Sequence, residues 1–122
     1  MNRFCLISGA VAGCLAVVLG AFGAHGLKAI ISADSLAIFE TAVRYQMYHS
    51  MALLALAALP LGSRRLVGRL WVAGMVIFSG SLYVLAITGI KWMGAITPIG
   101  GVCFILGWAR LAWEGWRLNP SE

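Results

Sequence analysis

The stretch LWVAGMVIFSGSLYVLAITGI, residues 70–90, contains no charged side chain over 21 positions. An α-helix needs about 20 predominantly apolar residues to cross a hydrocarbon core of about 30 Å. Three further stretches without Asp, Glu, Lys or Arg cover residues 4–27, 45–63 and 92–109. The sequence therefore predicts four membrane-spanning helices, near residues 4–24, 42–60, 68–90 and 97–116.

The composition points to the same class of protein. Hydrophobic residues make up 61% of the chain and charged residues only 11%, whereas about a quarter of a typical soluble domain is charged. A soluble chain of 122 residues has too much surface to hide this much apolar sequence. Disordered, collagen-like and disulfide-stapled secreted chains are excluded on composition as well. We predict an all-α integral membrane protein whose residues 1–122 form one four-helix transmembrane domain.

The basic residues are distributed unequally between the two ends of such a bundle. One end would carry six arginines, namely Arg3, Arg64, Arg65, Arg69, Arg110 and Arg117, and the other would carry Lys28, Arg44 and Lys91. The positive-inside rule then places both termini in the cytoplasm. The basic residues behind the net charge of +5 are therefore interpreted as determinants of membrane topology. The sequence contains no recognition motif that would indicate nucleic-acid binding.

The first predicted helix has two features of its own. It is longer than the apolar core of a signal peptide, which favours a retained helix. Cys5 and Cys14 lie on opposite faces of it, and with Cys103 they show no CxxC spacing, which indicates inert packing.

Small residues form a stripe along the same helix. Gly9, Gly13, Ala16, Gly20 and Ala24 recur at three- and four-residue steps. In lipid, such residues allow helices to approach closely, either within one chain or in a dimer. Gly100 and Gly101 in the last helix predict close helix packing as well.

The segment from residue 27 to residue 44 is amphipathic. Asp34 or Ser35 is expected to cap a helix there, and Glu40 and Arg44 to pair one turn apart. We expect this segment to lie near the membrane interface and to continue into the second spanning helix. Before it, Gly26 is expected to end the first helix in the left-handed conformation.

Five local predictions concern the other helix ends. Residues 63–69 are expected to form a basic turn, and Trp71 to lie at the inner interface. Thr97 and Pro98 fit the N-cap and first residue of the last helix. Trp108, Trp113 and Trp116 resemble an aromatic belt at the end of this helix, and Arg110 can reach Glu114.

The polar residues of the spanning helices gather toward the outer end in this topology. We predict a polar pocket there that includes His25, Tyr45, Gln46, Tyr48, His49, Ser81 and Tyr83. Polar groups within a bilayer usually face the bundle and often mark a function. The pocket would bind a small polar ligand, a lipid headgroup or a proton; the alternative is a hydrogen-bond network that only holds the helices together.

No complete catalytic or metal-binding pattern accompanies these residues. A zinc site lacks enough ligands, and His49 lacks a buried carboxylate for a hydrolase triad. We therefore expect no cofactor and no metal. A haem held between His25 and His49 is an alternative.

Four segments in order resemble the signature of one family. They are GAFGAHG at residues 20–26, YQMYH at 45–49, FSGSLY at 78–83 and TPIGG at 97–101. They resemble the bacterial membrane family known as domain of unknown function 423, to which eukaryotic transmembrane protein 256 is similar. The resemblance covers nearly the whole chain and implies a four-helix inner-membrane protein. It implies no reaction.

The sequence as a whole favours a non-enzymatic multi-pass bundle. Its expected partners are membrane lipids, and a further copy or another membrane protein is possible. A subunit of an oligomeric transporter or channel is the first alternative, and the haem-binding redox protein is the second.

Overall fold

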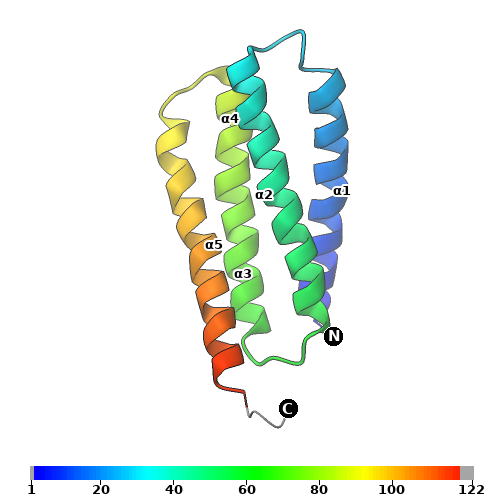
Figure 1. Cartoon of the computed structure of the whole chain (residues 1–122), viewed down its shortest axis with the longest axis vertical. Coiled ribbons are helices and arrows are strands. Elements are labelled where there is room, and N and C mark those ends of the chain that lie inside the picture. Colours follow the sequence, from blue (N-terminus) through cyan, green and yellow to red (C-terminus); the bar gives the residue numbers. More distant parts are fainter. Residues whose placement is uncertain (1, 119–122) are drawn as a thin grey trace.

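A computed structural model shows an all-helical chain, and it describes residues 2–118 apart from the side chain of Ala24 (Figure 1). The elements are α1 (Arg3–His25), α2 (Ala33–Ala58), α3 (Arg64–Gly74), the π-helical η1 (Met75–Ser79), α4 (Gly80–Thr88) and α5 (Met93–Trp116). Because α3, η1 and α4 follow one another without a break, they form a single rod. Four antiparallel rods result, and α1 begins at the end of the bundle where α5 ends.

Three of the rods have the length and apolar character of membrane spans. They are Arg3–Gly23, Arg64–Thr88 and Met93–Trp116. Large apolar side chains cover their outer surfaces; Val17, Val76 and Ile105 are each more than 60% exposed. Exposed apolar surface on this scale is typical of helices that face lipid. The prediction of an all-α membrane protein is confirmed at this level.

Close packing between α1 and α2 depends on small residues. The Ser50 hydroxyl on α2 donates a hydrogen bond to the Gly9 carbonyl oxygen on α1 over 2.6 Å. A Cβ atom on Gly13 would lie 2.7 Å from the same hydroxyl, and one on Gly20 would lie 3.4 Å from Val43. Ala16 is buried as well. The stripe of α1 therefore packs within the chain; the side chain of Ala24, its last member, lies outside the described residues.

The contact between α5 and the α3–η1–α4 rod uses a second set of glycines. A Cβ atom on Gly100 would lie 2.8 Å from the Phe78 Cα atom of η1, whereas one on Gly101 would lie 3.9 Å from the Phe78 ring. Gly107 faces the Trp71 indole in the same way. Only one glycine of the Gly100–Gly101 pair is therefore needed for the close approach.

Helix α2 begins earlier than predicted. It starts at Ala33 rather than near residue 42, so the amphipathic segment is its first half and continues directly into the rest. The N-cap is Ser32, whose hydroxyl accepts from the Ser35 backbone N–H over 3.1 Å, and not Asp34 or Ser35. The predicted Glu40–Arg44 pair is present, with 3.7 Å between the charged groups.

The two turns at the ends of α1 and α2 also differ from the predictions. Gly26 has a φ of −89°, so α1 does not end in the left-handed conformation; Gly89, with a φ of 71°, provides that cap after α4. Residues 64–69 are helical rather than a turn, because α3 begins at Arg64. The Arg64 guanidinium donates to the Ala57 carbonyl over 3.1 Å and so holds α3 to the end of α2.

Helix α5 also begins earlier, at Met93, which places Pro98 inside the helix. Loop carbonyls explain this start, because Ile90 and Lys91 accept from the backbone N–H groups of Met93 and Gly94 at 3.2 and 3.1 Å. Thr97 is thus not the N-cap. Its hydroxyl lies 2.5 Å from that of Ser81 on α4, which ties the two helices together.

Candidate functional site

A polar pair joins three helices in the middle of the bundle. Gln46 on α2 is 7% exposed, and its side-chain nitrogen donates to the Ala12 carbonyl of α1 over 2.9 Å. Its side-chain oxygen accepts from the Tyr83 hydroxyl of α4 over 2.6 Å. The Tyr83 ring also packs on Phe39, with 5.1 Å between ring centroids. Both ends of the Gln46 amide are therefore hydrogen-bonded, as burial in an apolar bundle requires.

These two residues line the floor of a lateral groove of about 410 Å³. Helix α1 packs on α2 and α3 but makes no close backbone approach to η1 or α4, and this separation leaves the groove between them. Val11 and Leu15 form one wall, and Val76 belongs to the other. All three are at least half exposed, so the groove opens sideways from the bundle.

Gly80 keeps the groove wide. It lines the groove at the start of α4, and a Cβ atom there would meet no atom within 4 Å. The residue before it, Ser79, is buried, and its hydroxyl donates to the Ala42 carbonyl of α2 over 2.8 Å. The α3–η1–α4 rod is therefore held to α2 beside the groove. At Gly80, no side chain of the rod extends into the groove.

His49, one turn after Gln46 on α2, lies in an aromatic cluster. Its ring stacks on Phe104 at 3.7 Å between centroids, and the rings of Trp71 and Trp108 approach it edge-on. The Trp108 indole N–H donates to Nε2 of His49 over 3.0 Å, and Nδ1 lies 2.8 Å from the Tyr45 carbonyl oxygen. His49 is only 4% exposed. Its two ring nitrogens thus have one partner each.

The structure distributes the residues of the predicted polar pocket over several places. Gln46 meets Tyr83, His49 meets Trp108, and Ser81 meets Thr97, in three separate contacts. The remaining members, His25, Tyr45 and Tyr48, have exposed side chains. On the α2 wheel, His49 lies between Tyr45 and Gln46, and the rings of both Tyr45 and His49 pack on Phe104.

The geometry also argues against the haem alternative. His25 ends α1 at the end of the bundle where α2 begins, whereas His49 lies 16 residues into α2, which is about 24 Å along the helix axis. Two axial ligands of one iron must lie at the same depth. Within residues 2–118, no three His, Cys, Asp or Glu side chains are grouped as a metal site would require.

Sequence reasoning missed the partners of His49. Trp71 was expected at the inner interface and Trp108 in an aromatic belt, but Trp71 is only 1% exposed and Trp108 donates to His49. Gly107 was the available signal, because a glycine in the middle of an apolar helix indicates that a large side chain packs against it.

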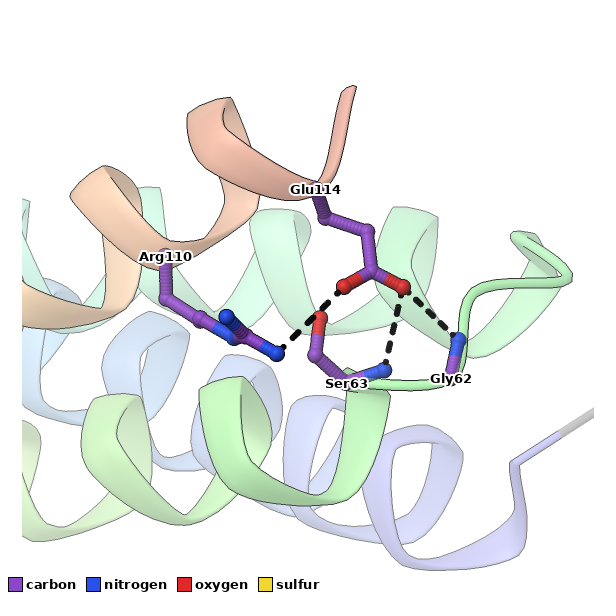
Figure 2. Close-up of polar contacts among 4 residues, drawn as sticks. All are labelled: Gly62, Ser63, Arg110 and Glu114. Atoms are coloured by element: carbon purple, nitrogen blue, oxygen red, sulfur yellow. Dashed lines mark hydrogen bonds and ion pairs between the residues drawn. The ribbon is translucent and has the colours of Figure 1, made fainter. Parts of the chain in front are cut away.

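A further polar contact ties α5 to the loop between α2 and α3 (Figure 2). Glu114 accepts hydrogen bonds from the backbone N–H groups of Gly62 and Ser63, at 3.0 and 3.4 Å. The predicted pair with Arg110 is present at 3.7 Å. Glu114 therefore holds the loop as well as pairing with a neighbour on its own helix.

Comparison with known proteins places this bundle in a family. The model of a family described as "Protein of unknown function (DUF423)" matches residues 19–101. A UPF0382 membrane protein of Staphylococcus saprophyticus is 51% identical over 110 residues, which cover 87% of this chain and 91% of the relative.

Two further relatives extend the comparison. The UPF0382 membrane protein YwdK of Bacillus subtilis is 49% identical over 87% of this chain and 90% of its own length. The UPF0382 inner membrane protein YgdD of Escherichia coli is 40% identical over 97% of this chain and 93% of its own length. No solved structure matches the chain. The chain therefore belongs to the DUF423 family of uncharacterised membrane proteins.

Proposed function

We propose that this chain is a non-enzymatic bundle that crosses the membrane four times and holds an acyl chain of a membrane lipid in its lateral groove. The observation that carries the proposal is the groove itself, which has apolar walls, opens sideways and lies between helices of membrane-spanning length. Membrane lipids are then the partners of the protein.

Helix α2 supports the count of four spans. Its 26 residues correspond to about 39 Å, enough to cross a bilayer. It packs against α1 on one side and against the α3–η1–α4 rod on the other. Its polar residues Gln46 and His49 are buried within the bundle, as expected for polar groups at membrane depth. Glu40 and Arg44, its paired charges, lie nearer the end that follows the first loop.

The arginine distribution supports cytoplasmic termini. In the folded bundle, the end where α1 begins and α5 ends also holds the first turns of α3. All six arginines predicted for that side belong to these segments. The positive-inside rule assigns this end to the cytoplasm.

The depth and chemistry of the groove suit an acyl chain. On the α3–η1–α4 rod its lining extends from Val72 to Tyr83, a rise of about 16 Å. One leaflet contributes about 15 Å of hydrocarbon. The polar atoms of Gln46 are bonded to Tyr83 and Ala12, which favours a structural role for this pair and leaves the groove mostly apolar.

Filling the groove tests the proposal. Because a Cβ atom on Gly80 meets no atom within 4 Å, Gly80→Leu starts a side chain in the groove from an open position. Gly115→Leu is the matched control, since Gly115 is also helical and equally open but lies outside the groove. In native mass spectrometry from mild detergent, Gly80→Leu should lose co-purified phospholipid and Gly115→Leu should retain it. Equal retention by both variants would refute the proposal.

A further inference from the structure

The exposed arginines of α3 indicate which lipid the groove would hold. We infer that Arg65 and Arg69 bind the phosphate of an anionic glycerophospholipid whose acyl chain occupies the groove. This inference rests on the proposed function, because it assigns the headgroup class of the same lipid.

The two arginines continue the line of groove residues on the rod. Arg65, Arg69, Val72 and Val76 are separated by four, three and four positions, which places them on one face of a helix. Val72 and Val76 line the groove. The apolar groove therefore has a basic extension toward the end of the bundle where α3 begins.

Both guanidinium groups are available for a ligand. Arg65 and Arg69 are exposed, and among residues 2–118 the structure pairs neither with an acidic side chain. By contrast, Arg110 pairs with Glu114, and Arg64 is bonded to the Ala57 carbonyl. A phosphate group is a ligand that guanidinium groups bind with two parallel hydrogen bonds.

The depth of these residues fits a single lipid molecule. Arg69 precedes Val72, the first groove residue of the rod, by three positions, or about 4.5 Å of helix rise. A long arginine side chain extends its charge further toward the membrane surface. A lipid whose phosphate meets Arg69 thus has its chain directed along the groove toward Tyr83.

The charge balance selects an anionic headgroup over a zwitterionic one. A zwitterionic headgroup would bring its own cation close to two arginines that lack a carboxylate partner among the described residues. A headgroup with a net negative charge neutralises the charge of the two arginines instead. Each basic residue near an anionic surface changes the affinity by about fivefold, equivalent to about 1 kcal/mol.

The test compares two lipids on the full chain. Phosphatidylglycerol and phosphatidylcholine with identical acyl chains are titrated onto delipidated protein in mild detergent, and the bound lipid is measured by native mass spectrometry. The variants are Arg69→Gln, Arg117→Gln and Gly80→Leu. Arg117→Gln is the matched control because it removes one exposed arginine from the same end of the bundle but from the end of α5.

The inference predicts that the unmodified chain prefers phosphatidylglycerol, that Arg69→Gln reduces this preference about fivefold and that Arg117→Gln leaves it unchanged. Equal losses in both arginine variants would show diffuse attraction and overturn the inference. Equal binding of both lipids by the unmodified chain would also overturn it, while leaving the proposed function intact if Gly80→Leu still abolishes binding. Unchanged binding by Gly80→Leu would instead overturn the proposed function.

Discussion

Trp108 donates its indole N–H to Nε2 of His49 across 3.0 Å, and this contact joins the later part of α5 to the interior of the bundle. Because Nε2 acts as the acceptor, the imidazole carries its proton on Nδ1 and donates it to the Tyr45 carbonyl oxygen, 2.8 Å away. His49 is thus a neutral, fully bonded residue within an aromatic cluster. This arrangement favours a structural role over proton transfer.

Replacement of His49 should therefore destabilise the bundle. His49→Ala removes both hydrogen bonds and the ring that stacks on Phe104. The expected cost is about 2–4 kcal/mol, from a lost buried side chain and an unpaired donor. Thermal unfolding in detergent measures it. His25→Ala is the control, since His25 is exposed, and a comparable loss of stability in that variant would contradict this account of His49.

The adjacent glycines of α5 provide a second test. Gly100→Ala places a Cβ atom 2.8 Å from the Phe78 Cα atom, so α5 and η1 must separate. We expect a loss of about 1–3 kcal/mol. Gly101→Ala adds a methyl group 3.9 Å from the Phe78 ring, an ordinary contact, and should leave stability unchanged or slightly higher. Thermal midpoints of the two variants should differ accordingly, and equal midpoints would show that the close approach is not required.

Glu114 should control the mobility of the loop between α2 and α3. Glu114→Ala removes the acceptor of the Gly62 and Ser63 backbone N–H groups (Figure 2). Hydrogen exchange of these amides should become faster. Glu40→Ala removes an exposed pair with Arg44, and no backbone N–H group donates to its carboxylate in the described residues, so exchange at the loop should not change. Identical exchange at Gly62 in both variants would refute the role assigned to Glu114.

The four-span topology predicts a labelling pattern. In a background without native cysteines, Ala29→Cys lies in the exposed loop between α1 and α2, and Gly115→Cys lies near the end of α5. A membrane-impermeant maleimide should label Ala29→Cys in intact spheroplasts. Gly115→Cys should react only after permeabilisation. The reverse pattern would invert the proposed orientation. Labelling of both sites from outside would require an even number of crossings between them and would contradict the four-span topology, which has three there.

The sequence predicted the elements of the fold because membrane depth imposes a simple pattern. Charge-free runs of about 20 residues are typical of membrane-spanning helices. Each boundary error has a local cause. Pro98 was taken as the start of a helix, but loop carbonyls at Ile90 and Lys91 satisfy earlier N–H groups and extend α5 to Met93. The positions of backbone carbonyl groups in a loop cannot be predicted from side-chain identity.

The candidate site was harder to predict because it depends on contacts between helices. The sequence identified Gln46, His49 and Tyr83 as unusual, but one helical wheel does not show which neighbour each side chain meets. The groove is a consequence of where α1 separates from η1 and α4, and that separation is a property of the assembled helices.

Three interhelical hydrogen bonds have one design in common: Ser50, Gln46 and Ser79 each donate from a side chain to a main-chain carbonyl, at Gly9, Ala12 and Ala42 respectively. A main-chain oxygen is supplied by any amino acid, so the two ends of each bond tolerate mutation unequally. In a saturation scan, the donor positions should reject nearly every alternative, whereas Ala12 and Ala42 should accept replacements on grounds of size alone. The acceptor positions are therefore constrained by the space around them, and the donor positions by their hydrogen bonds.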